Sequence, residues 1–178
     1  MPGKGHIIRE RYEATAKGYD ELYRAEQYKK YFVALRRIPP SGTILDAGCG
    51  TGLLIEFLAL QGLLHNIKEY HCLDYSRQML KIAATRAKLY CPHKCLLIEA
   101  NIMNPPYPDK TFDITYSFTV LDLVDNIQKT IKQLKRITKK QIIITMLKTL
   151  PYKDIILKKY QPKIIGTTDK DIILQIPT

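Results

Sequence analysis

The chain has 178 residues, of which 46% are hydrophobic and 25% are charged. That length and balance are typical of one globular domain. No run of residues approaches the roughly 20 apolar positions that a membrane-spanning helix needs, and the first residues lack the apolar core of a signal peptide. We therefore expect a single domain over residues 1–178, located in the cytoplasm and without a membrane partner.

The net charge of +11 is concentrated toward the C-terminus. Residues 126–178 carry 12 basic and 3 acidic side chains, whereas residues 41–125 carry 7 basic and 9 acidic ones. A basic block can attract phosphates or acidic proteins at long range, but a solvated, lysine-rich surface has the same composition. The charge is therefore compatible with a nucleic acid or protein partner and does not require one.

Hydrophobic periodicity predicts helices that alternate with strands. An N-terminal helical cap (residues 1–40) precedes a core (41–147), and a short helix with a closing hairpin follows (148–178). These elements predict an α/β fold with a doubly wound, mostly parallel seven-stranded sheet, to which the antiparallel hairpin adds an edge strand. The expected helices are 8–37 (interrupted near Gly18), 53–64, 77–89 with Ser76 as N-cap, 123–138 and 151–160; the expected strands are 43–47, 71–75, 94–99, 112–117, 141–147, 163–167 and 172–176.

A glycine-rich turn lies between the first expected strand and the helix after it, at Gly48-Cys49-Gly50-Thr51-Gly52. Glycines there permit positive φ angles and let a ligand approach the backbone. A phosphate-binding P-loop would require Lys after the last glycine, where Leu53 stands. The dinucleotide-binding fingerprint would require Gly at the same position, so both nucleotide patterns are excluded.

Three segments together resemble one family. Leu45-Asp46-Ala47-Gly48-Cys49-Gly50-Thr51-Gly52 resembles motif I of the class I S-adenosylmethionine-dependent methyltransferases. The segments 106–113 and 12–20 resemble the branch called methyltransferase type 11, and the likeness covers about residues 12–147. The resemblance implies a Rossmann-like methyltransferase fold, S-adenosylmethionine as cofactor and S-adenosylhomocysteine as product.

The resemblance also implies roles for individual residues. Asp74, at the end of the second strand, would accept hydrogen bonds from the ribose hydroxyls, for which a carboxylate is suited. Tyr75 and Met79 match positions that pack near the adenine, although ordinary helix packing explains Met79 equally well. Asn101 and Ile102 stand where the family usually has Asp-Ala, with the Asp side chain facing the adenine amino group. Asn101 can still accept from that group through its carbonyl oxygen, so the departure weakens this assignment without removing it. The complete expected cofactor set is Tyr19, Asp46, Ala47, Gly48, Cys49, Gly50, Gly52, Asp74, Tyr75, Met79, Asn101, Ile102, Ser117 and Phe118.

A general base is needed only if the acceptor must lose a proton. Asp122, just past the fourth strand, is one candidate, but it is also a plausible N-cap for the next helix. Asp125 and Tyr19 are the other candidates. Covalent catalysis is not needed, because the cofactor already carries an activated methyl group.

Two further patterns admit simpler interpretations. Cys91-Pro92-His93-Lys94-Cys95 offers three metal ligands, but zinc sites usually need four, so we expect reduced thiols and no metal. The Asn-Pro-Pro-Tyr sequence at 104–107 resembles a motif of enzymes that methylate adenine amino or glutamine amide nitrogens. In those enzymes it follows the fourth strand, whereas here it precedes it, so we expect no catalytic role.

The acceptor is not determined by these motifs. The basic C-terminal third suggests RNA or a translation-related protein, with the acceptor or a partner bound there. The tyrosine-rich N-terminal helix suggests instead a small molecule, as in the type 11 branch. A third hypothesis is a non-catalytic, cofactor-binding subunit of a complex.

Overall fold

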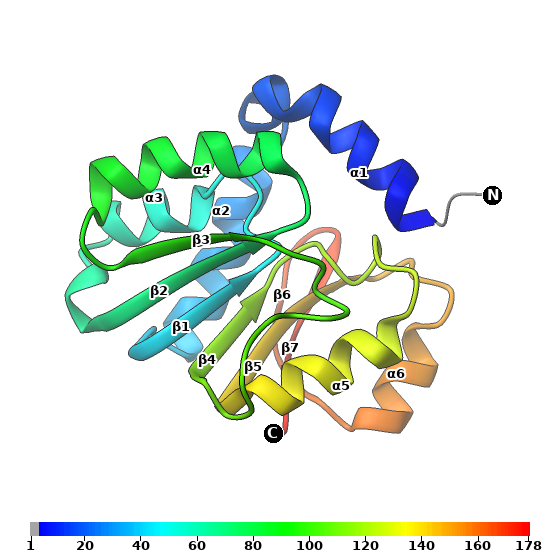
Figure 1. Cartoon of the computed structure of the whole chain (residues 1–178). Helices are drawn as coiled ribbons and strands as arrows, with labels where there is room; N and C mark the ends of the chain where they lie inside the picture. Colours follow the sequence, from blue (N-terminus) through cyan, green and yellow to red (C-terminus); the bar gives the residue numbers. More distant parts are fainter. Residues whose placement is uncertain (1–3) are drawn as a thin grey trace.

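A computed structural model describes residues 4–178 (Figure 1). Helices and strands alternate as expected, and Gly18 lies where the first helical region is interrupted. The helical elements are α1 (Lys4–Thr15), η1 (Ala16–Gly18), α2 (Tyr19–Arg37), α3 (Leu53–Leu60), η2 (Leu64–Asn66), α4 (Arg77–Tyr90), α5 (Ile127–Ile137) and α6 (Lys153–Tyr160). The strands are β1 (Gly42–Ala47), β2 (Ile67–Asp74), β3 (Cys95–Glu99), β4 (Phe112–Ser117), β5 (Thr138–Leu147), β6 (Lys163–Thr167) and β7 (Asp171–Ile176).

One seven-stranded sheet has the order β3-β2-β1-β4-β5-β7-β6. The pairs from β3 to β5 are parallel, and β7 is antiparallel to both β5 and β6. The predicted fold class and closing hairpin are therefore confirmed. The expected antiparallel edge strand is β6, the first strand of the hairpin, and β7 lies between it and β5. Local sequence does not decide which hairpin strand pairs with β5.

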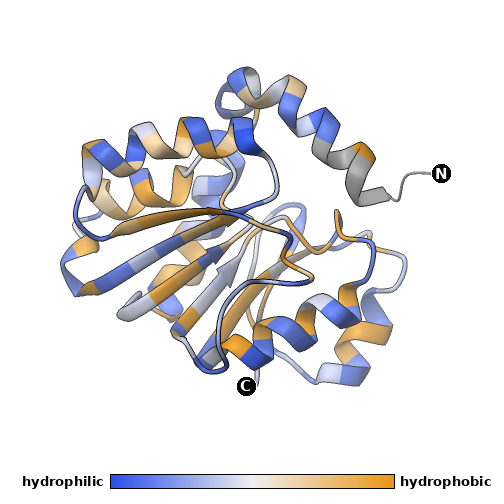
Figure 2. Cartoon of the chain, viewed as in Figure 1, coloured by the Kyte–Doolittle hydropathy of each residue, from blue (hydrophilic) through white to orange (hydrophobic). Residues whose placement is uncertain are grey.

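Helices cover both faces of the sheet (Figure 1). One hydrophobic cluster joins α2, α3 and α4 to the sheet, and a second joins α5 and α6 to the opposite face. Figure 2 shows hydrophilic and hydrophobic residues together along α4 and α5, as expected for amphipathic helices packed on a sheet. Residues of each buried strand contribute to both clusters, so the sheet forms the centre of the core.

Helices α3 and α5 are each shorter than expected, because the chain turns at Gly62 after α3 and Asn126 caps the start of α5. Helix α3 ends at Leu60, where Gly62 adopts a φ of +66° and the chain turns back. Helix α5 begins after Asn126, whose side chain accepts a hydrogen bond from the Lys129 N–H over 2.9 Å. Ser76 caps α4 as predicted, since its hydroxyl accepts from the Met79 N–H over 3.2 Å.

The expectation of four reduced thiols was wrong for one pair. Cys91 and Cys95 form a disulfide, with Cα atoms 5.8 Å apart, in the turn between α4 and β3. The N–H groups of Lys94 and Cys95 both donate to the Cys91 carbonyl oxygen, and this tight turn brings the two side chains together. Cys49 and Cys72 are buried thiols.

Within the described part of the chain, no helix is both long and apolar enough to cross a membrane.

Candidate cofactor and acceptor site

A cavity of about 260 Å³ opens at the carboxyl ends of the parallel strands. In doubly wound folds this edge is where ligands bind, because the chain reverses its direction of winding there. Helix α1 passes over this edge, and its Tyr12 contributes to the cavity wall (Figure 1). The lining residues are Tyr12, Tyr19, Gly48, Gly50, Leu73, Asp74, Tyr75, Ser76, Met79, Ala100, Asn101, Ile102, Met103, Phe118, Thr119, Val120, Leu123, Val124 and Asp125.

The glycine-rich turn forms the floor of one end of the cavity. Gly48 has a φ of +84°, and a Cβ atom there would lie 2.3 Å from Cγ2 of Val120. Gly50 has a φ of +55°, and a Cβ atom there would meet no atom within 4 Å. The first glycine is thus required by packing, whereas the second leaves open space beside the backbone. That space fits a ligand that lies directly on the turn.

Asp74 lies at the end of β2 beside this turn. Its Oδ2 accepts from the Gly50 N–H and its Oδ1 from the Ser76 N–H, each over 2.8 Å. Burial raises the pKa of the Asp74 carboxyl, and the backbone donors partly oppose that rise. Each carboxylate oxygen keeps one further acceptor position. The arrangement fixes Asp74 rigidly and leaves it able to accept from two hydroxyls.

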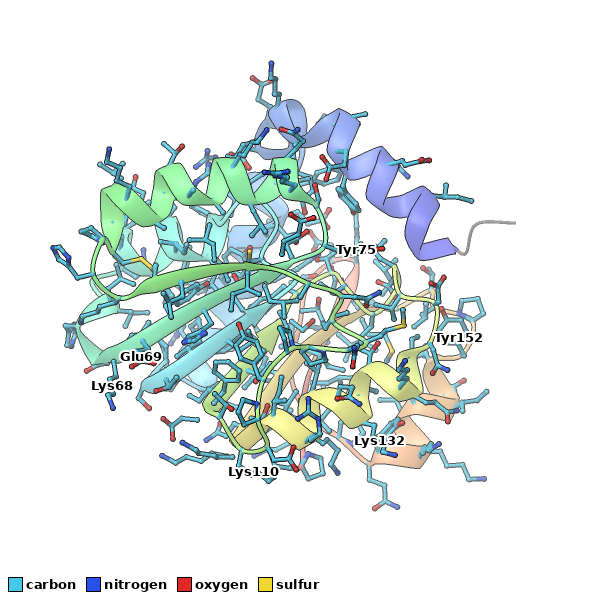
Figure 3. The ribbon with its side chains drawn as sticks, in the orientation of Figure 1. Lys68, Glu69, Tyr75, Lys110, Lys132 and Tyr152 are labelled. Carbon is cyan, nitrogen blue, oxygen red and sulfur yellow. A yellow bond between two sulfur atoms is a disulfide. The ribbon has the colours of Figure 1, made fainter. Side chains whose placement is uncertain are left out.

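The expected adenine-side residues gather on the same cavity. Tyr75, Met79, Asn101 and Ile102 all line it, and Figure 3 shows Tyr75 at the edge of the sheet beneath α1. The Asn101 Oδ1 accepts from the Met103 N–H over 2.8 Å, which fixes the orientation of the amide. Asn101 can still accept a second hydrogen bond through the same oxygen. Tyr19 of α2 and Phe118, which follows β4, also line the cavity.

Asp46 lies deeper, in a small adjoining cavity of about 20 Å³. This inner cavity shares Tyr19, Gly48, Gly50 and Phe118 with the larger one, and Cys49 also lines it. The Tyr70 hydroxyl donates to Asp46 Oδ2 over 2.7 Å. Burial raises the pKa of Asp46 to about 7, against the lowering effect of that hydrogen bond. A cationic group entering the inner cavity would favour the ionised carboxylate.

Four of the expected site residues line neither the main cavity nor the inner one. Ala47 is fully buried, and the Ser117 hydroxyl donates to its carbonyl oxygen over 2.9 Å. Gly52 faces Ala83 of α4, with its Cβ position 3.1 Å from the Ala83 backbone. Asp122 is half-buried and does not cap α5, since Asn126 does. Cofactor or catalytic roles for these four residues stay predictions.

Apolar residues that the sequence did not single out form the rest of the cavity wall, here called the apolar end, which adjoins the glycine-rich turn where Val120 faces Gly48. Met103 precedes β4, and Val120, Leu123 and Val124 lie in the loop after it. These residues belong to no recognised sequence motif. They meet only because the loop before β4 and the loop after it lie side by side at the cavity. Asp125 is the carboxylate that borders this apolar end. Thr119, which precedes Val120 in the same loop, has a φ of +60°, which is rare for a β-branched residue.

The segment 104–107 lies away from the cavity. The Tyr107 ring packs edge-on against His71 and Phe112, with centroids 5.5 and 4.7 Å apart. The carbonyl oxygens of Pro105 and Tyr107 accept hydrogen bonds from the Arg136 guanidinium. The segment is therefore held against the sheet on the side of α5. Among the described residues, no three His, Cys, Asp or Glu side chains gather as a metal site.

Comparisons with known proteins agree with this geometry. Residues 45–145 match a family model described as "Methyltransferase domain". A demethylmenaquinone methyltransferase from Bacillus licheniformis is 32% identical over 135 residues, which cover 72% of this chain and 56% of that protein. A malonyl-[acyl-carrier protein] O-methyltransferase from Halorhodospira halophila is 28% identical over 137 residues, covering 74% and 44%. The chain thus spans about half the length of these curated relatives.

Solved structures show the same fold. A magnesium protoporphyrin IX methyltransferase from Synechocystis with bound SAM has a TM-score of 0.75 and 15% identity, covering 100% of this chain and 99% of that one. A SAM-dependent methyltransferase from Aquifex aeolicus has a TM-score of 0.72 and 17% identity, covering 92% and 98%. Together with the family match over more than half of the chain, these findings show that the protein belongs to the methyltransferase-domain family, with the fold and cofactor type of class I S-adenosylmethionine-dependent methyltransferases.

Proposed function

We propose that this protein transfers the methyl group of S-adenosylmethionine to a small, largely apolar acceptor. The observation that carries the proposal is the two-ended cavity. A polar end fits the cofactor, and an apolar end formed by Met103, Val120, Leu123 and Val124 adjoins it. Ligand sites are usually concave and mostly apolar, with a few oriented polar groups, and this cavity has that character.

The polar end would hold the cofactor through groups that are already oriented. Asp74 would accept from ribose hydroxyls, the Asn101 oxygen would face the adenine amino group, and Gly50 would let the cofactor lie on the turn. When bound, the cofactor supplies a sulfonium with an activated methyl group. The protein's part is then to bind, to orient and to exclude water. Orientation alone can account for roughly 7–11 kcal/mol of the barrier at the extreme.

The apolar end would hold the acceptor against the cofactor. Its hydrophobic lining favours an acceptor whose bulk is carbon, and it would shed water from the reacting atoms. Asp125 borders this end and is exposed, so it is placed to take a proton from an acidic hydroxyl. None of the described residues that line the cavity is basic, so a negatively charged acceptor buried there would lack a cationic partner among them.

The names of the relatives favour the same class of acceptor. Those names specify demethylmenaquinone and a malonyl group on a carrier protein as the molecules methylated. The alternative of an RNA or protein acceptor is supported only by the lysine-rich surface of α5 and α6, where Lys129, Lys132, Lys135 and Lys159 line a shallow groove. Figure 3 shows Lys132 on the outer side of α5.

The test is a transfer assay with S-adenosylmethionine labelled in its methyl group. The acceptors would be a short-chain prenylated hydroquinone, a malonyl thioester of a carrier protein, and bulk RNA, each with wild type and with Asp74→Ala. Label in the hydroquinone or thioester that Asp74→Ala abolishes would support the proposal. Label in RNA alone would overturn the acceptor class. Tight cofactor binding with no turnover on any acceptor would favour the non-catalytic subunit.

A further inference from the structure

A fully buried lysine lies behind the cavity. The Lys30 side chain, on α2, is 0% exposed. Its ammonium lies 3.1 Å from Oδ2 of Asp171, which is also 0% exposed, and 2.9 Å from Oε1 of Glu26. Burying a lysine is costly unless its charge is paired and its protons are bonded. Packing alone does not account for a lysine at this position. The third hydrogen bond of the Lys30 ammonium points to a further role.

The third bond reaches the cavity wall. The Lys30 ammonium donates to the Thr119 hydroxyl over 2.8 Å. Gln27, three residues earlier on α2, donates to the same hydroxyl over 3.1 Å, and the Thr119 N–H donates to the Thr145 hydroxyl over 2.7 Å. Thr119 lines the cavity and is held at a φ of +60°. A strained residue at a ligand site persists only when its surroundings over-determine its conformation, and here three polar groups do so.

The same group of residues also holds Tyr19. The Gln27 amide donates to the Tyr19 hydroxyl over 3.3 Å, and Tyr19 lines both the main cavity and the inner cavity of Asp46. Lys30, Gln27 and Tyr19 all belong to α2, whereas Asp171 starts β7 and Thr119 follows β4. The Lys30 ammonium thus joins α2 to Thr119 and Asp171, which are distant from it in sequence.

We propose that Lys30 is a positioning residue, which uses its buried ion pair with Asp171 to fix Thr119, and through Gln27 also Tyr19, in the conformation that binds the cofactor. The inference rests on the proposed function, because it assigns Lys30 to the cofactor site. Lys30 itself does not line the cavity. Its contribution is to keep one wall from relaxing to an unstrained loop that would fit the cofactor poorly.

The chain contains a matched control for this ion pair. The next residue back, Lys29, forms an ion pair with Asp169 at the same 3.1 Å distance, between the same helix and the turn before β7. Those side chains are 63% and 86% exposed, and neither lines the cavity. Exposed pairs of this kind contribute little to stability, so removal of Lys29–Asp169 should leave binding unchanged.

The first experiment measures the affinity for S-adenosylhomocysteine by calorimetry in Lys30→Met/Asp171→Asn and Lys29→Met/Asp169→Asn. The double substitutions avoid leaving one buried charge unpaired. We expect the Lys30 variant to bind about tenfold more weakly, the size associated with one lost hydrogen bond to a charged group. The Lys29 variant should stay within about twofold of wild type. Equal affinities for the two variants would overturn the inference.

A second pair of variants keeps the test decisive if the Lys30 variant does not fold. Thr119→Val retains the β-branched shape and loses the hydroxyl, whereas Thr119→Ser retains the hydroxyl. Thr119→Val should weaken S-adenosylhomocysteine binding about tenfold, whereas Thr119→Ser should bind it with nearly wild-type affinity. Thr119→Val added to the Lys30 variant should cause little further loss, because both act through one contact. Wild-type affinity in Thr119→Val would overturn the inference, and a wild-type protein without affinity would overturn the proposed function itself.

Discussion

The cavity has a polar end at the glycine-rich turn and an apolar end at the loop after β4. At the polar end, Asp74 is fixed by two backbone N–H groups, and the Asn101 oxygen by another. At the apolar end, Leu123 and Val124 offer shape and hydrophobicity without oriented polar groups. Oriented polar groups select one chemical structure, whereas apolar walls accept many of similar size. On the proposed function, the comparison leads us to expect specificity by hydrogen bonding for the cofactor and by shape for the acceptor.

The largest expected effect is at the polar end. Asp74→Ala should lower the affinity for S-adenosylhomocysteine about 100-fold, because two charge-assisted hydrogen bonds to the ribose are lost. Asp125→Ala, at the other end, should change that affinity by less than about twofold. Calorimetric titration measures both, with thermal unfolding to verify that each variant folds. Similar losses in the two variants would show that the cavity does not divide as described.

The next effect concerns the floor of the polar end. Gly48→Ala would place a Cβ atom 2.3 Å from Val120 at a φ of +84°. We expect a destabilisation of about 1–3 kcal/mol and an affinity for S-adenosylhomocysteine about tenfold lower. Gly62→Ala is the control, since Gly62 has a φ of +66° with no atom within 4 Å of its Cβ position. Equal losses of stability and of S-adenosylhomocysteine affinity in the two variants would show that backbone strain, and not the contact with Val120, is the cause.

A smaller effect is expected at the apolar end. Leu123→Asn should raise the KM for the acceptor about fivefold, because a polar amide would replace part of a hydrophobic wall. The affinity for S-adenosylhomocysteine should stay within about twofold. Ile155→Asn, at a 62% exposed position on α6, is the matched control and should change neither quantity. A large loss of S-adenosylhomocysteine affinity in Leu123→Asn would show that the two ends do not act as separate binding regions.

The smallest effect lies outside both ends, at His71. Burial lowers the pKa of His71, and Glu69 at 3.5 Å partly opposes that change. The unfolded chain therefore takes up the proton more readily, so the folded state loses stability as pH falls below about 6.5. His71→Phe, which keeps an aromatic ring against Tyr107 and Phe112, should remove up to about 1 kcal/mol of that loss between pH 7 and pH 5. Chemical unfolding at several pH values measures it, and an unchanged pH dependence would contradict the assignment.

Features encoded within a few consecutive residues could be predicted from the sequence. The turn at 48–52, the cap at Ser76 and the acidic end of β2 each depend on local backbone chemistry, and each lies where expected. The disulfide was missed because a Cys pair four residues apart is equally consistent with free thiols until the turn geometry is known. The start of α5 was placed too early because Asp122 and Asn126 are both good caps, and only one accepts from the helix.

The sequence by itself determined the sheet of alternating strands and helices, the glycine turn and the class of cofactor, because each follows from periodicity or from a contiguous motif. Tertiary structure decided the order β5-β7-β6, the apolar end of the cavity and the buried pair of Lys30 and Asp171. These features join residues up to 141 positions apart, as Lys30 and Asp171 are. No local preference encodes such a contact, since it depends on how whole elements pack and on which charges that packing removes from water.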